Sequence, residues 1–325
     1  MSTLFAPTSL PAKYRHNLPL AGDGLFLSDG GIETTLIYLE GLELPYFAAF
    51  DLLRSGDGRA ALDRYYRTHA AIARDHGTGF VLESATWRAS TDWGVKLKYA
   101  FADLVAINHQ AIAMLHELRD EFETPGTPMV ISGCIGPRGD GYRADRRMSV
   151  AEAETYHTMQ ARVFAEAGAD LVSAITMTYV EEAIGVVRAA RRADMPVVVS
   201  FTTETDGRLP SGQSLGEAIQ QVDEATQAAP AYYMVNCAHP THFADVLASG
   251  AGWTKRIGGL RANASRKSHA ELDAATALDI GDPVELGEQY RELRRLLPGI
   301  RVLGGCCGTD HRHIQAISRA CTRVK

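Results

Sequence analysis

The sequence lacks the segments that would span a membrane or direct the chain out of the cell. No apolar run in its 325 residues is long enough to cross a bilayer. Residues 1–17 do not show the charged-then-apolar order of a signal peptide. The chain has only five cysteines, and no export signal accompanies them. We therefore expect reduced thiols and a cytoplasmic protein without a membrane partner.

Basic surface and nucleotide-binding signatures are missing as well. The formal net charge is −6, which provides no cationic face for nucleic acid. Neither G-x-G-x-x-G nor the phosphate-binding motif G-x-x-x-x-G-K-S/T follows a predicted strand. The paired C-x-x-C motifs of zinc fingers are absent too. These absences exclude nucleic-acid-binding and nucleotide-cradling classes and favour small-molecule partners.

What the sequence does contain is a regular alternation of short apolar runs and longer amphipathic segments. Apolar residues make up 46% of the chain and charged residues 22%, so a large core can form. Apolar and polar residues alternate with strand and helix periods in turn. The predicted strands cover 25–28, 79–86, 128–134, 170–176, 196–202, 232–237, 256–262 and 301–305. The predicted helices cover about 57–75, 102–122, 149–167, 180–192, 215–228, 242–249, 283–297 and 311–322.

This alternation implies a parallel sheet. Eight strand–helix units in one chain favour a closed α/β (β/α)8 barrel, the TIM barrel, over an open doubly wound sheet. We expect an N-terminal arm over residues 1–24 and a single barrel domain over residues 25–325. In such barrels the chemistry lies at the carboxyl ends of the strands, so the residues that end each strand are the candidates for a site.

Three cysteines stand at such strand ends. Cys237 ends the sixth predicted strand, and Cys306 and Cys307 follow the eighth within the run G-G-C-C-G-T. Glycines weaken a strand and allow close backbone approach, so this run is a poor core element. Three thiolates from two strand ends would hold a zinc ion and leave its fourth position open, as catalytic zinc sites do.

Other interpretations of the cysteines carry less weight. Cys134 and Cys321 are expected to be packed in the core, where single cysteines are common. A disulfide between the adjacent pair would be strained. His239 would close the site as a fourth ligand, so we favour the three-cysteine set, Cys237, Cys306 and Cys307, with zinc as the cofactor.

The chemistry of such a centre leaves three functions open. A thiol with a pKa near 8.5 is mostly protonated at neutral pH, and metal binding converts it to the nucleophilic thiolate. A zinc hydrolase whose open position holds water is an alternative, and a non-catalytic zinc-binding or redox-sensing thiolate protein is another. Three sulfur ligands with no strong base beside them favour a sulfur nucleophile over the hydrolase.

The motifs at these strand ends resemble those of the homocysteine S-methyltransferase family. Its D-G-[AG], N-C and G-G-C-C-[RG]-T motifs are matched in order, and the similarity covers nearly the whole chain. The resemblance implies a zinc-dependent methyltransferase on a TIM barrel. It would move a methyl group from a sulfonium or quaternary ammonium donor to a thiol acceptor, homocysteine or a related thiol. The matching segments lie at 29–31, 236–237 and 304–309, with weaker matches at 133–137 and 167–171.

The resemblance and the strand ends together predict the site residues. We expect Asp29 and Glu83 to be catalytic, with Asp29 orienting substrate or neighbouring the zinc. We expect substrate contacts from Gly30, Gly31, Thr86, Trp87, Thr176 and Asn236. Further candidates are aromatic faces for a methylated cation and arginines for a substrate carboxylate. These are Trp87, Trp93, Tyr142 and Tyr179 for the first role, and Arg138 and Arg143 for the second.

One position departs from the family pattern. In members that act on homocysteine, a glutamate after the fourth strand grips the substrate amino group. Ile175 occupies that position here and cannot bind an ammonium. Either another acid, with Glu83 as the candidate, substitutes for it, or the acceptor is a different thiol. The sequence identifies neither the methyl donor nor the oligomeric state, and it is compatible with a homo-oligomer.

Overall fold

Eight parallel strands close into a barrel in the computed structural model, which describes residues 10–322. The strands follow one another around the barrel in chain order, and the last pairs in parallel with the first, with Phe26 opposite Val302. The predicted TIM barrel is confirmed. The strands are β1 Phe26–Ser28, β2 Gly79–Glu83, β3 Met129–Ile135, β4 Leu171–Met177, β5 Val197–Thr202, β6 Tyr233–Asn236, β7 Ile257–Ala262 and β8 Val302–Gly305.

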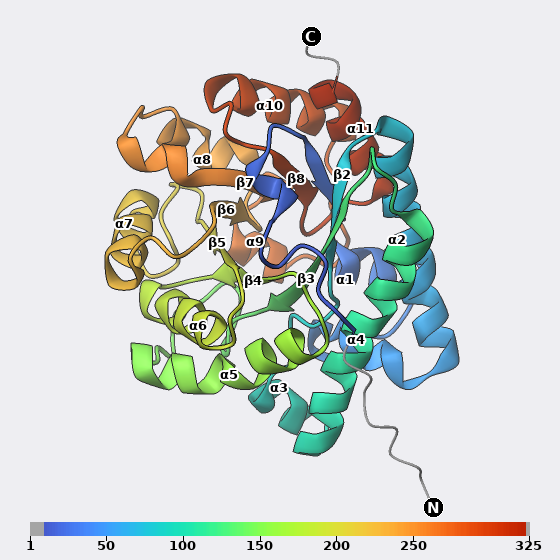
Figure 1. Cartoon of the computed structure of the whole chain (residues 1–325). Helices are drawn as coiled ribbons and strands as arrows, with labels where there is room; N and C mark the ends of the chain where they lie inside the picture. The colour runs from blue at the N-terminus through green and yellow to red at the C-terminus, as the bar shows by residue number, and fades with distance from the viewer. Residues whose placement is uncertain (1–9, 323–325) are drawn as a thin grey trace, which may run out of the picture.

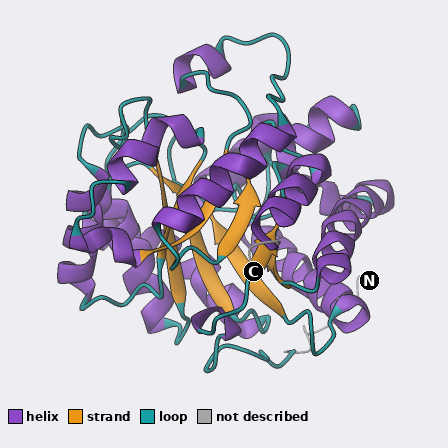
Figure 2. Ribbon diagram, turned by 90° about the horizontal axis from the view of Figure 1, so that it is seen from above, coloured by secondary structure: helices purple, strands orange, loops and turns teal. Residues whose placement is uncertain are grey.

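A ring of helices surrounds these strands (Figure 1), and the view turned by 90° shows helices on both flanks of the strands and in front of them (Figure 2). Helix α5 begins at the capping box that the sequence predicts, in which Ser149 and Glu152 satisfy each other's backbone N–H groups. Within residues 10–322, no helix combines the length and the apolar character needed to cross a membrane. The main helices are α2 Gly56–His76, α4 Phe101–Phe122, α5 Val150–Glu166, α6 Val180–Arg192, α7 Leu215–Thr226, α8 Pro240–Leu247, α10 Pro283–Leu296 and α11 His311–Thr322.

The core has two parts, as the barrel architecture requires. A large apolar layer lies between the strands and the helices, and a smaller cluster fills the interior of the barrel. The interior cluster includes Phe26, Val130, Leu171 and Val302. The barrel is therefore a packed solid, and ligands are restricted to its ends.

The described part of the N-terminal arm, residues 10–24, docks against the amino ends of the strands and crosses in front of them in Figure 1. The backbone N–H groups of Lys13 and Tyr14 donate to Asp170 Oδ1 at 2.8 and 2.7 Å. The other carboxylate oxygen of Asp170 accepts from the buried Arg119 at 2.8 Å. Residues 1–9 of the predicted arm lie outside the described residues.

Short helices that the sequence patterns do not predict follow β1, β2 and β7 at the opposite, carboxyl end. Each is too brief to show a helical period. The strand predicted over 79–86 also ends earlier, at Glu83, so that Thr86 and Trp87 belong to the following loop. These short helices are α1 Ile32–Thr34, η2 Thr35–Leu39, η3 Pro45–Phe47, η4 Ala49–Arg54, α3 Thr91–Lys96 and α9 His269–Asp273. Of these, α1, η2, η3 and α9 contribute residues to the wall of the cavity described below.

Candidate metal centre and substrate cavity

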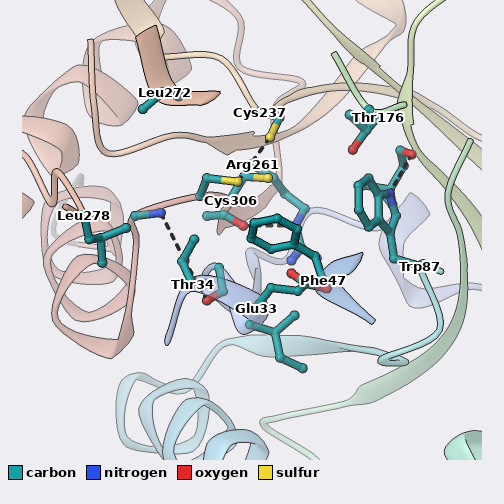
Figure 3. A pocket seen from close by; sticks show the side chains of 18 of the residues that line it. Glu33, Thr34, Phe47, Trp87, Thr176, Cys237, Arg261, Leu272, Leu278 and Cys306 are labelled. Atoms are coloured by element: carbon teal, nitrogen blue, oxygen red, sulfur yellow. Dashed lines mark hydrogen bonds between the residues drawn. The ribbon is translucent and has the colours of Figure 1, made fainter. Parts of the chain in front are cut away.

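A cavity opens at the carboxyl ends of the strands, and all three predicted metal ligands line it. Cys237 and Cys306 are labelled in Figure 3. The Sγ atoms of Cys237, Cys306 and Cys307 lie within 4.8 Å of one another, and those of Cys237 and Cys307 are 3.5 Å apart. Sulfurs at about 2.3 Å from a tetrahedral zinc would be about 3.8 Å apart. The three thiols therefore fit a zinc ion that keeps one position open.

The backbone around the thiols fixes their directions. Cys237 follows β6 with a φ of 56°, a left-handed conformation that is costly for a residue with a side chain. Its N–H donates to the Arg261 carbonyl at 3.1 Å, and the Cys306 N–H donates to the Ala262 carbonyl at 2.9 Å. Both cysteines are thus tied to β7, the strand that lies between β6 and β8.

Gly31 allows the loop after β1 to lie directly against the cysteine loop. A Cβ atom at this position would stand 2.4 Å from the Cys306 carbonyl oxygen, closer than real contacts allow. The Gly31 N–H also donates to the Thr309 carbonyl at 3.0 Å. The D-G-G and G-G-C-C-G-T motifs are therefore two halves of one packed unit.

We expect Gly31→Ala to weaken zinc binding by tenfold or more, because the added methyl group must displace the Cys306 carbonyl and shift the ligand loop. Competition with a chromophoric chelator measures this affinity. Gly252→Ala is the matched control, since a Cβ there meets nothing within 4 Å. Equal zinc affinity in both variants would show that the loop contact does not position the ligand.

The charge state of the three thiols also favours a bound cation. Hydrogen bonds from Cys237 and then Cys307 lower the pKa of Cys306, with the Arg261 guanidinium adding to the effect. Hydrogen bonds with Cys306 and Cys307 raise the pKa of Cys237. The hydrogen bond with Cys237 lowers the pKa of Cys307, but the contact with Cys306 and burial outweigh it and raise that pKa. Three thiols this close cannot all ionise without a positive partner. A divalent metal provides one.

Asp29 and Glu83 both line the cavity, and a buried arginine links them. The Arg261 Nη2 donates to Asp29 Oδ1 at 2.7 Å, and its Nη1 lies 3.6 Å from Glu83 Oε2. Tyr65 donates its hydroxyl to Asp29 Oδ2 at 3.0 Å. Burial raises the pKa of Glu83 to about 7, although the charge of Arg261 opposes that rise. Asp29 is held in place by these contacts and stays beside the cysteine loop.

Of the predicted substrate contacts, Gly30, Gly31, Trp87 and Thr176 line the cavity, and Thr86 and Asn236 do not. Thr86 is fully buried, and its hydroxyl donates to the Cys134 carbonyl at 2.7 Å. Asn236 lies behind the site, where its Nδ2 donates to Thr176 Oγ1 at 2.8 Å and lies 3.9 Å from Cys306 Sγ. These two residues support the cavity wall.

Tyr142 reaches the metal centre from the loop between β3 and α5. Its hydroxyl lies 3.6 Å from Cys237 Sγ and 3.5 Å from Cys307 Sγ. Its ring stacks on His269 of α9 with centroids 4.1 Å apart, and the His269 Nε2 lies 2.8 Å from the Cys237 carbonyl oxygen. Two loops that are distant in sequence therefore cover the thiols together.

The remaining candidate residues lie outside the cavity. Trp93, Tyr179, Arg138 and Arg143 are not among the residues that line the cavity. The two arginines form exposed ion pairs instead, with Asp92 and Asp273 respectively. His239 caps the start of α8 and is not part of the metal-ligand cluster.

Among the lining residues that the sequence patterns do not identify are Glu33, Phe47 and Arg88. Glu33 and Phe47 lie in the short helices α1 and η3, whose few residues give no periodic signal. Arg88 is the neighbour of Trp87 and follows β2 by a few residues. Only its position could have identified Arg88 from the sequence, because charged residues that closely follow barrel strands are candidates for a functional site.

The architecture and the site define a TIM barrel with a cluster of three thiols, able to hold a metal ion, at the carboxyl ends of its strands. The model of the homocysteine S-methyltransferase family matches residues 26–321. The chain belongs to the homocysteine S-methyltransferase family and is a homocysteine S-methyltransferase-like enzyme, as its motifs predict.

Individual relatives are distant. Homocysteine S-methyltransferase 1 of Arabidopsis thaliana is 22% identical over 322 residues, which covers 91% of this chain and 93% of the relative. Homocysteine S-methyltransferase YbgG of Bacillus subtilis is 25% identical over 229 residues, covering 64% and 68%. Among solved structures, the homocysteine methyltransferase MmuM from Escherichia coli, in an oxidized form, superposes with a TM-score of 0.74 at 18% identity, covering 93% of this chain and 97% of that one.

Proposed function

We propose that this chain is a zinc-dependent methyltransferase that moves a methyl group from a sulfonium or quaternary ammonium donor to a thiol acceptor, homocysteine or a related thiol. The convergence of three thiols within 4.8 Å of one another, in a cavity at the barrel's catalytic end, carries this proposal. Family membership supports methyl transfer over hydrolysis. MmuM, which has the same fold, has been solved in a metallated form, which agrees with a metal at these strand ends.

The donor set suits a sulfur nucleophile. Zinc held by Cys237, Cys306 and Cys307 would bind the acceptor sulfur as a thiolate at neutral pH. During transfer the acceptor sulfur forms a bond to the methyl carbon while the bond from that carbon to the donor's sulfur or nitrogen breaks. The bonding electron pair leaves with the donor, which loses its positive charge. The acceptor proton is released to solvent when the thiolate forms.

The chain's own side chains hold the two reactants in place. Asp29, fixed by Arg261 and Tyr65, borders the cysteine loop. Trp87 and Phe47 present aromatic faces to the cavity (Figure 3), and such faces attract methylated cations.

The expected result of a direct assay is methylation of at least one thiol by the zinc-loaded enzyme. Purified protein would be incubated with homocysteine or other small thiols against S-methylmethionine, S-adenosylmethionine, glycine betaine and dimethylsulfoniopropionate. Mass spectrometry would identify the methylated thiol and the demethylated donor in equal amounts. Protein that carries a full complement of zinc and methylates none of these thiols would overturn the proposal. Zinc-free protein is the control.

A further inference from the structure

Arg88 is a buried cation without a carboxylate partner. It is 5% exposed and lines the cavity. Its guanidinium carbon lies 3.9 Å from the ring centroids of both Trp87 and Trp93. Nη1 donates to the Gly139 carbonyl at 2.8 Å, whereas Nε has no hydrogen-bond partner. Among residues 10–322, Arg88 forms no ion pair with an acid.

This arrangement is costly unless something else occupies the cavity. An arginine removed from water needs an opposite charge or a full set of acceptors. Burial lowers the pKa of Arg88 to about 10, which leaves it charged at neutral pH. Asp140 also lines the cavity, but its Oδ1 accepts from the Tyr142 N–H at 2.8 Å. The two tryptophan rings hold the guanidinium fork in one plane, which suits a carboxylate.

Glu33 presents a carboxyl group to the same cavity (Figure 3). Burial raises its pKa to about 7, so the group is partly protonated at neutral pH and a bound cation would favour its charged form. Its carboxylate forms no ion pair and no hydrogen bond to another side chain within the described part of the chain. Two other lining acids are engaged by Arg261, which binds Asp29 and lies 3.6 Å from Glu83. The remaining lining acids have partners as well: Asp140 accepts from the Tyr142 N–H, Asp273 lies 3.6 Å from Arg143, and Asp279 lies 3.6 Å from Lys267. Glu33 is therefore the cavity acid that is free to receive a cation.

We propose that Arg88 and Glu33 form a two-point clamp for a zwitterionic substrate, with Arg88 binding its carboxylate and Glu33 its ammonium or sulfonium group. The clamp rests on the proposed function and specifies how this chain recognises a reactant. Ile175 occupies the position where family members that act on homocysteine carry a glutamate. In the clamp, Glu33 on α1 takes the role of that missing acid, in place of the predicted Glu83. An amino-acid thiol and an amino-acid sulfonium both carry the required pair of charges.

Binding to the zinc-loaded enzyme, measured by calorimetry, tests the clamp without requiring turnover. Three thiols are compared. Homocysteine carries both charges, 4-mercaptobutanoate lacks the amine, and 3-aminopropane-1-thiol lacks the carboxylate. Any sulfur–metal contact is common to all three and cancels in the comparison. S-methylmethionine and (3-aminopropyl)dimethylsulfonium form the corresponding donor pair.

We expect Arg88→Met to weaken binding of ligands with a carboxylate by about ten- to a hundredfold and to change binding of those without it by less than twofold. Glu33→Gln should weaken homocysteine and 3-aminopropane-1-thiol and spare 4-mercaptobutanoate. If the selective loss falls on the thiols, the clamp holds the acceptor, and if it falls on the sulfonium pair, it holds the donor. Arg138→Gln, which changes an exposed arginine outside the cavity, should change none of these affinities.

Two outcomes would overturn the clamp. One is an equal loss for ligands with and without the carboxylate in Arg88→Met, which would make Arg88 a purely structural residue. The other is unchanged binding of every ligand in both variants. Should Arg88→Met fail to fold, Arg88→Lys retains the charge without the planar fork and should show the same selectivity with a smaller loss. If the variants show the expected selectivity but the enzyme transfers no methyl group, the clamp stands and only the proposed function is contradicted.

Discussion

Cys306→Ala is expected to abolish both zinc binding and methyl transfer while leaving the barrel folded. Two sulfurs remain in this variant, too few to hold the ion in a site that already keeps one position open. The fold should survive because the strand pairs next to Cys306 are made by backbone groups of β7 and β8, and the apolar core does not include this side chain.

Metal analysis and X-ray absorption check this expectation. The unaltered protein should contain about one zinc per chain, with sulfur neighbours at roughly 2.3 Å. Cys321→Ala is the control, because Cys321 packs in the core on α11 and its removal should leave the zinc content unchanged. A zinc site dominated by nitrogen or oxygen neighbours, or full zinc in Cys306→Ala, would contradict the three-cysteine centre. The assay needs a reductant, since oxidation could join two of these thiols and release the metal.

Arg261→Met is expected to lower the free energy of unfolding by about 3–5 kcal/mol, because it leaves Asp29 and Glu83 buried without their cationic partner. Methyl transfer should fall sharply as well, since Asp29 loses the contact that fixes it beside the cysteine loop. Urea unfolding followed by circular dichroism measures the first effect, and initial rates at saturating zinc measure the second.

The contrast with an exposed ion pair isolates the effect of burial. Arg266 pairs with Glu285 at the surface, where both side chains are about half exposed. Arg266→Met should therefore cost less than about 1 kcal/mol and leave activity unchanged. If Arg261→Met proves no more harmful than Arg266→Met, the buried network does not hold the site together.

The fold could be predicted from the sequence because each strand and main helix has its own periodic pattern, and eight such units admit few arrangements. The candidate metal ligands could be predicted for a related reason. In a parallel barrel all strands end at the same side, so Cys237 and Cys306 must approach one another although 69 positions separate them.

The substrate side of the site was much less predictable. Glu33 and Phe47 belong to short helical turns that leave no periodic trace, and their directions depend on packing between loops. Arg138 and Arg143 were reasonable candidates for a carboxylate because they follow β3, yet neither lines the cavity, and both pair with half-exposed acids of the chain. Arg88 turns inward because two tryptophans enclose it, a contact that involves the tertiary fold of α3.

The docking of the arm on Asp170 has a consequence for how the protein folds. Lys13 and Tyr14 meet a partner that lies 157 and 156 positions further along the chain. Closing so long a loop is entropically unfavourable until the intervening strands are in place, so these contacts form late. Interactions absent from the folding transition state slow unfolding without speeding folding. We therefore expect the arm to slow unfolding of the closed barrel and to contribute little to the rate at which the barrel forms.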